Sequence, residues 1–259
     1  MTESQSSGIP PNPGLPAPSN PVAWIQASLQ SLDEMISAGF NSPSIILWAF
    51  FNEGPDQMES ACAAYALVAE RIRQRDPSRL VTWASRYGAA AVCDDISDVI
   101  ARNVYPGWYP DVGEQKWDCL GHTPQSCWAA IGPSLTDVFT NLSHFNKPMM
   151  ISEIGAGAVA GFRDRTLQSP WSENFQANHY AAIARWDSAT NLTVGLAIWQ
   201  FADIREEDSG GGGSWSPLVP DREKPETRND KGMLDAYHQP KLAYWAIRQV
   251  WRPGEVLEW

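Results

Sequence analysis

The sequence predicts an α/β protein with a parallel β-sheet, and three observations support this fold class. The run from Ile45 to Phe51 is continuously apolar, so it suits a strand buried on both faces of a parallel sheet. A second apolar run, Met149 to Ile151, also leads into a glutamate. Between these runs, apolar residues recur at spacings of three and four, which indicates helices. Alternating strands and helices predict a parallel sheet with right-handed crossovers.

The chain opens with a segment, residues 1–21, that is rich in Ser, Pro, Gly and Asn and has no periodic apolar residues. This composition predicts a disordered lead-in. The Asn20-Pro21 pair then opens a helical pattern that runs to Gly39, and the first strand follows it.

The later elements keep the same alternation. In residues 58–75, Tyr65, Val68 and Ile72 share one face, which predicts a helix that ends before Asp76-Pro77. Long loops are expected after Pro106, over 155–170 and over 202–229. The expected helices are residues 22–39, 58–75, 134–145, 172–189 and 241–251, and the expected strands are centred near Ile46, Val81, Ala101, Met150 and Ala197.

Two of these strands end in a glutamate. Glu53 follows Asn52, and Glu153 follows Ser152. In parallel α/β proteins the chemistry collects at the carboxyl ends of the strands. Two carboxylates at one rim are what double-displacement glycoside hydrolysis requires, one as nucleophile and one as acid and base. The alternative for Glu53 is that it merely opens the next helix, where a carboxylate favours the positive end of the helix dipole.

Both motifs resemble signatures of glycoside hydrolase family 2, the β-galactosidase and β-glucuronidase family. The stretch from Trp48 to Asn52-Glu53 resembles its acid/base signature, and Ile151 to Ala156 resembles its nucleophile signature. The resemblance implies a retaining exo-β-glycosidase with Glu53 as general acid/base and Glu153 as nucleophile. A retaining site holds its two carboxyl groups about 5–5.5 Å apart, whereas an inverting hydrolase, the alternative enzyme, needs them farther apart.

The resemblance also implies part of a (β/α)8 TIM barrel, covering residues 22–252, with 253–259 as a C-terminal tail. The Glu53 strand resembles the fourth barrel strand and the Trp199 strand the eighth. The first three strand–helix units, and the β-sandwich domains that precede the barrel in this family, have no counterpart. Five strands would leave unpaired edges, so we expect an isolated chain to aggregate, to form oligomers or to need a missing N-terminal part.

Several further residues resemble those that line the family's sugar site. The resemblance implies that the nucleophile or the sugar hydroxyls are hydrogen-bonded by Asn103, Tyr105 and Tyr109. It also implies a substrate contact for Asn52, which directly precedes Glu53. Trp199 resembles a sugar-stacking tryptophan. The alternative for this aromatic-rich turn and for Trp199 is ordinary core packing.

A turn near the C-terminus bears on the substrate. Asn229 and Lys231 stand two residues apart, and an amide with an ammonium group can hold a carboxylate. Glucuronidases of the family use an Asn-x-Lys pair for the uronate carboxylate. Asn and Lys also suit an ordinary turn, so β-galactosidase stays open.

The charge and composition of the chain limit the classes of binding partner that it suits. A formal net charge of −11 without a basic run argues against nucleic acid or an anionic membrane. The 13 tryptophans suit sugar rings as well as core bulk. The sequence indicates no metal site and implies no cofactor. Without a signal-peptide pattern, a cytoplasmic location and free thiols are the default expectation, although Cys119 and Cys127 could pair under oxidising conditions.

Two other classes of function remain open. The chain could be a truncated or degenerate sugar-binding relative with little hydrolytic activity, or a structural α/β module. Two glutamates at strand ends argue against the last. Activity of the purified chain on nitrophenyl β-glycosides distinguishes the first two.

Overall fold

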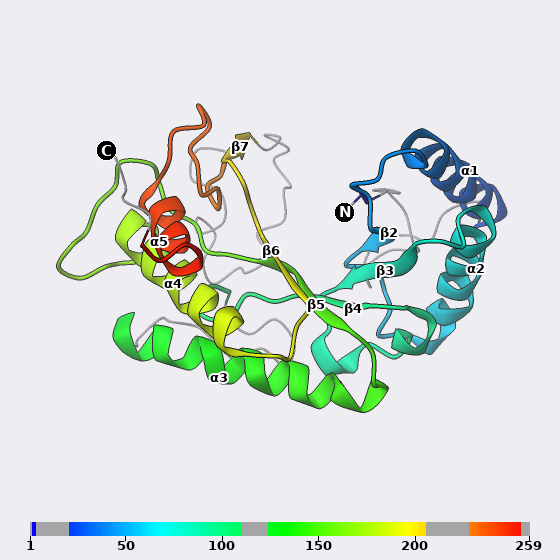
Figure 1. Cartoon of the computed structure of the whole chain (residues 1–259), viewed down its shortest axis with the longest axis horizontal. Helices are drawn as coiled ribbons and strands as arrows, with labels where there is room; N and C mark the ends of the chain where they lie inside the picture. The colour runs from blue at the N-terminus through cyan, green and yellow to red at the C-terminus, as the bar shows by residue number, and fades with distance from the viewer. Residues whose placement is uncertain (1, 4–20, 110–123, 206–227, 255–259) are drawn as a thin grey trace. The chain divides into compact units, whose positions relative to one another are not determined.

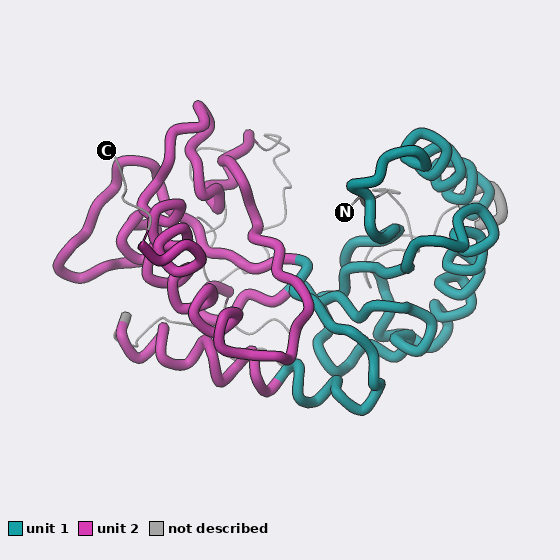
Figure 2. Tube along the Cα trace, viewed as in Figure 1, with its two compact units in different colours: residues 1–103, 138–152 teal, residues 104–137, 153–259 magenta. Residues whose placement is uncertain are grey.

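The computed structural model describes residues 2–3, 21–109, 124–205 and 228–254. These belong to two compact units, residues 1–103 with 138–152 (unit 1) and residues 104–137 with 153–259 (unit 2), which Figure 2 colours separately. Helices and strands alternate along the chain (Figure 1), and the hydrogen-bonded order of the main sheet is β1-β2-β3-β4-β5-β6. The predicted α/β class with a sequentially ordered sheet is confirmed.

Unit 1 contains the parallel strands that lead to Glu53 and Asn103. The pairs β1–β2, β2–β3 and β3–β4 are all parallel. Trp48 stands opposite Val81, and Asn52 stands opposite Ala84 beyond an irregularity in the ladder. The strands are β1 (Thr2–Glu3), β2 (Leu47–Asn52), β3 (Leu80–Ser85) and β4 (Ile100–Asn103).

The lead-in differs from expectation at Thr2 and Glu3. These two residues pair with Trp48 and Ala49 of β2. The outer edge of β2 presents backbone groups that a short extended segment can satisfy. The rest of the lead-in lies outside the described residues, apart from Pro21, which starts a helix.

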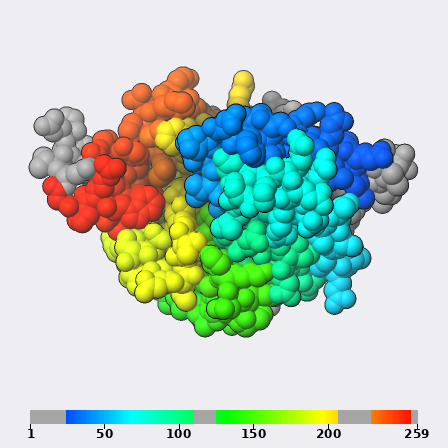
Figure 3. All heavy atoms as spheres, turned by 45° about the vertical axis from the view of Figure 1, so that its right-hand side comes forward, coloured from blue at the N-terminus to red at the C-terminus, as the bar shows by residue number. Residues whose placement is uncertain are grey.

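The helices of unit 1 are α1 (Pro21–Gly39) and α2 (Glu59–Arg75). They lie side by side on the face shown in Figure 3, in blue and cyan, and α2 also packs against β2 and β3. The core between helix and sheet is rich in aromatic rings. It includes Trp48, Phe50, Tyr65, Ile72 and Trp83, each at most 2% exposed.

A disulfide between Cys62 and Cys93 links α2 to the segment before β4, with a Cα–Cα distance of 5.2 Å. The expectation of free thiols is wrong for this pair, because folding brings together two cysteines that are 31 residues apart in sequence. Cys127 is also disulfide-bonded. Cys119 lies outside the described residues.

Unit 2 carries the second half of the chain. Its elements include α4 (Glu173–Ala189), β6 (Gly195–Ile198) and α5 (Leu242–Trp251), and α4 packs along α5. A second core lies near the strand ends, where Trp108, Cys127, Ala156 and Phe175 are buried. Two elements run through both units: α3 (Pro124–Leu142) and β5 (Met149–Ile154).

Two predicted boundaries are wrong. Helix α3 begins ten residues before the expected Ser134 and contains both Pro133 and Cys127, which was expected in a loop. Burial at spacings of three and four carries the helix through Gly132 and Pro133. The buried residues are Cys127, Ile131, Leu135, Phe139 and Leu142.

The expected loop over 202–229 is also paired at its base. Strand β7 (Ile204–Arg205) is antiparallel to β8 (Arg228–Asn229), and Ile204 stands opposite Asn229. Residues 206–227, with the glycine tetrad, lie outside the described residues. Among the helices that are described, none has the length and apolar character needed to cross a membrane.

Candidate active site

The residues expected to act on a substrate form two groups, one in each unit. In unit 1 these are Asn52, Glu53 and Asn103, and in unit 2 they are Tyr105, Tyr109, Glu153, Trp199, Asn229 and Lys231.

Glu53 lies one residue beyond the end of β2. Its φ of 53° is in the left-handed region, which non-glycine residues rarely adopt and which concentrates at functional sites. Its backbone N–H still donates to the Ala84 carbonyl at 2.8 Å. The backbone is thus held to the neighbouring strand while the chain turns, and the carboxylate projects half-buried at the strand end.

Asn103 orients the side chains around Glu53. Its amide Nδ2 donates to Glu53 Oε1 at 3.0 Å and to Asn52 Oδ1 at 2.9 Å. The Ser152 hydroxyl donates to Asn103 Oδ1 at 2.7 Å. Because a hydroxyl donor occupies the amide oxygen, the amide nitrogen must face Asn52 and Glu53. Asn103 is 2% exposed, so this orientation is set inside the protein.

A cation also stands beside Glu53. Arg86 Nη1 is 3.7 Å from Glu53 Oε2. Glu53 therefore receives one amide hydrogen bond and one guanidinium contact within unit 1. These two contacts fix the position of the carboxylate at the strand end.

In unit 2, Tyr105 and Glu153 are joined directly. The Tyr105 hydroxyl donates to Glu153 Oε2 at 2.6 Å. The Tyr105 and Tyr109 rings meet edge to face at 5.0 Å, and Lys231 Nζ lies 5.2 Å from the centroid of the Tyr109 ring. Contacts thus run from the carboxylate through two aromatic rings to a buried ammonium group.

The segment from Val104 to Tyr109 is itself anchored. The Val104 N–H donates to the Glu153 carbonyl at 2.9 Å. The buried ring of His179 hydrogen-bonds the Pro106 carbonyl at 2.9 Å through Nε2. Burial lowers the pKa of His179 to about 4, so the ring is neutral at neutral pH.

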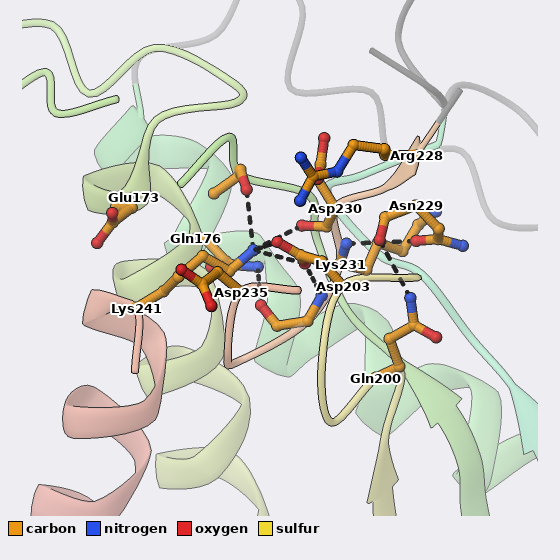
Figure 4. A network of polar contacts seen from close by, with 12 residues as sticks. Glu173, Gln176, Gln200, Asp203, Arg228, Asn229, Asp230, Lys231, Asp235 and Lys241 are labelled. Carbon is orange, nitrogen blue, oxygen red and sulfur yellow. Dashed lines mark hydrogen bonds and ion pairs between the residues drawn. The ribbon is translucent and has the colours of Figure 1, made fainter. Parts of the chain in front are cut away.

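Asn229 and Lys231 lie together in one compact turn (Figure 4). The backbone N–H of Lys231 donates to Asn229 Oδ1 at 3.3 Å. Asn229 is 7% exposed and Lys231 is 3% exposed. The Asn229 amide is therefore held against the backbone of Lys231, and both residues are nearly buried. Such a pair can hold an anion with little water to compete.

The backbone of Trp199 is fixed directly after β6. Its N–H donates to the Ile154 carbonyl at 2.9 Å, and its carbonyl accepts from the Tyr180 hydroxyl at 3.1 Å. Gly155 permits this approach, because a Cβ there would lie 2.1 Å from the Trp199 oxygen. The sugar-stacking role of the half-buried Trp199 stays a prediction.

Sequence reasoning missed the side chains that support these residues. Arg86 follows an expected strand, Tyr180 sits in an expected helix, and Lys241 opens the last one. Nothing in their spacing distinguishes them from ordinary helix or turn residues. Among the residues that the structure describes, no three His, Cys, Asp or Glu side chains gather as a metal site would require.

The chain is similar to known glycoside hydrolases. The sequence matches the family model described as "Glycosyl hydrolases family 2, TIM barrel domain" over residues 5–251. Human β-glucuronidase is 29% identical over 226 residues, which cover 85% of this chain and 30% of that protein. Rat β-glucuronidase is 28% identical over 231 residues, which cover 86% of this chain and 31% of that protein. The chain thus spans about a third of the length of these curated relatives.

A solved structure shows the same similarity. The GH2 β-galacturonidase from Eisenbergiella tayi, bound to galacturonate, aligns with a TM-score of 0.74 and 30% sequence identity. The alignment covers 90% of this chain and 37% of that chain.

Proposed function

Since this chain belongs to glycosyl hydrolases family 2 and contains part of that family's TIM-barrel domain, we propose that it carries the catalytic residues of a retaining exo-β-glycosidase acting on terminal β-uronides. The substrates would be β-glucuronides or β-galacturonides, the sugars named in the relatives and the solved structure. The catalytic residues would be Glu53 and Glu153.

The proposed reaction has two steps. The Glu153 carboxylate attacks the anomeric carbon, the glycosidic C–O bond breaks, and Glu53 gives its proton to the leaving oxygen. Glu53, now a carboxylate, then takes a proton from water, and the resulting hydroxide attacks the anomeric carbon and frees Glu153. The sugar leaves with its β configuration retained. The carboxyl spacing of about 5–5.5 Å that this mechanism requires stays a prediction.

One observation carries the choice of a uronide. Within unit 2, the Glu153 carboxylate and the Lys231 ammonium group are the two ends of one contact series through Tyr105 and Tyr109. A uronate has its reacting carbon and its carboxylate on the same ring. A nucleophile and a cation linked in this way suit these two groups.

The test is hydrolysis of a matched panel of nitrophenyl β-glycosides by the purified chain. The panel contains the glucuronide, galacturonide, galactoside and glucoside. We expect hydrolysis of the uronides and none by Glu153→Gln, which keeps the shape of the side chain without the nucleophilic charge. A chain that binds glucuronate but hydrolyses no member of the panel would instead be a sugar-binding relative. Preference for the galactoside would contradict the uronide proposal.

A further inference from the structure

Lys241 is a buried cation outside the predicted site residues. It is 2% exposed, and its ammonium group points away from α5, the helix that it precedes (Figure 4). Lys241 Nζ donates to the backbone carbonyls of Ala158 and Asp230, each at 2.9 Å. It also donates to both carboxylate oxygens of Asp203, at 2.8 and 3.1 Å.

Helix stability does not explain this lysine. A cation at the N-terminus of a helix is unfavourable, because the helix dipole is positive at that end. The first helical N–H, that of Leu242, is already bonded to Glu173 Oε2 at 2.9 Å. Burying an ion pair is also not by itself a gain in stability, because each charge loses its hydration. The contacts that Lys241 makes elsewhere must therefore account for its place.

Those contacts converge on the turn that holds Asn229 and Lys231. Lys241 Nζ bonds the carbonyl of Asp230, the residue between them. Its partner Asp203 accepts from the Gly232 N–H at 2.8 Å, on the other side of Lys231. Burial raises the pKa of Asp203 to about 6, against the opposing effect of Lys241, so the carboxylate is still ionised at neutral pH.

Further backbone groups of the turn are also bonded. Gln200 accounts for two of them, since its Nε2 donates to the Asn229 carbonyl at 3.2 Å and its N–H donates to the Lys231 carbonyl at 3.1 Å. The Tyr180 hydroxyl, which has one proton, lies 2.9 Å from the Lys231 carbonyl and shares that proton with the Trp199 carbonyl. Gly232 fits only without a side chain, because a Cβ would lie 2.2 Å from the Asp203 nitrogen. The ion pair is the charged part of this clamp.

We propose that Lys241 and Asp203 are positioning residues for uronate recognition: their ion pair fixes the backbone on both sides of Lys231 and so aims its ammonium group and the Asn229 amide at the sugar carboxylate. This inference rests on the proposed function. Neither residue touches the substrate in it. Their role is to keep the two recognition groups in one geometry.

The test uses Lys241→Met, which keeps the apolar stem and removes the donors. Hydrogen exchange followed by mass spectrometry is measured on the peptide over 228–234, and binding of glucuronate and glucose is measured by calorimetry. We expect faster exchange in this peptide and glucuronate affinity weakened by about tenfold to a hundredfold, the effect of losing charge-assisted bonds. Glucose binding should be unchanged.

A matched control is available in unit 1. Lys241 Nζ donates to two backbone carbonyls and one carboxylate, and Lys147 Nζ donates to three backbone carbonyls, those of Asp94, Asp95 and Ser97. Lys147→Met should lower the melting temperature without changing exchange over 228–234 or the preference for glucuronate. A second variant, Asp203→Leu with Lys241→Met, leaves no lone buried charge and guards against misfolding of the single variant. It should reproduce the exchange and binding changes.

Two results would overturn the inference. One is unchanged exchange over 228–234 in both Lys241 variants, and the other is an equal rise in exchange throughout unit 2, which would mean general destabilisation. Failure of the proposed function has a different signature. If Lys231→Ala leaves glucuronate binding intact, the uronate role is wrong for Lys231 and for Lys241 alike. The hydrogen-exchange data would then show only whether Lys241 orders the turn, with no bearing on uronate binding.

Discussion

The Tyr105 hydroxyl donates a 2.6 Å hydrogen bond to Oε2 of Glu153. A bond to a carboxylate contributes roughly 1.5–3 kcal/mol. Tyr105→Phe should therefore lower kcat/KM for nitrophenyl β-glucuronide by about tenfold to a hundredfold. Tyr237→Phe is the matched control, because Tyr237 is 83% exposed and should tolerate the change. Unchanged kinetics in Tyr105→Phe would remove this tyrosine from the site.

The acid/base role of Glu53 predicts a dependence on the leaving group. Glu53→Ala should lower kcat/KM strongly for alkyl β-glucuronides, whose leaving oxygen needs a proton, and much less for the dinitrophenyl glucuronide. Steady-state rates across a series of leaving groups measure this slope. An equal loss on every leaving group would contradict the assignment.

Lys231 should determine the preference for charged sugars. Lys231→Ala removes a nearly buried cation. The loss of kcat/KM for the glucuronide should correspond to roughly 2–4 kcal/mol of lost transition-state stabilisation, while kcat/KM for the glucoside should be almost unchanged. Lys147→Ala serves as the control for loss of a lysine far along the chain. A parallel fall for both sugars would indicate that Lys231 only stabilises the turn.

His179 makes stability depend on pH. Its ordinary pKa of 6.5 is lowered to about 4 by burial, so between these values the unfolded chain binds more protons than the folded one. The neutral His179 therefore adds to the free energy of unfolding. Its full contribution, about 3 kcal/mol, is present above pH 6.5 and is lost as the pH falls toward 4. Urea unfolding at several pH values should show the decline in the parent chain.

The matched variants separate this residue from the other titrating groups. In His179→Gln the decline in the free energy of unfolding between pH 6.5 and 4 should be smaller than in the parent. His238→Gln, at an exposed position, should keep the parent's slope. Identical slopes in all three proteins would show that His179 does not titrate as its burial implies.

The disulfide should matter for the stability of unit 1. Cys62 and Cys93 are 31 residues apart, and closing a loop of that length stabilises the fold by roughly 3–4 kcal/mol. The double variant Cys62→Ala with Cys93→Ala should lose about this much in urea unfolding. An unfolding free energy equal to that of the parent would mean that the bond does not constrain the unfolded chain.

By itself, the sequence determined the α/β class, the order of the elements and the strand ends that carry Glu53, Asn103 and Glu153. These features are local, because apolar runs and helical spacing report directly on burial and on backbone period. It also determined the Asn229 and Lys231 pair, since both residues stand within one turn.

Only the tertiary structure decided what surrounds those residues. Glu53 is contacted by Asn103, 50 residues away, and Asp203 is paired with Lys241, 38 residues away. The same holds for the Cys62–Cys93 bond and for helix α3, which continues through Pro133 because its apolar face is buried. Contacts between segments distant in sequence depend on how the chain packs, and no local pattern of residues encodes them.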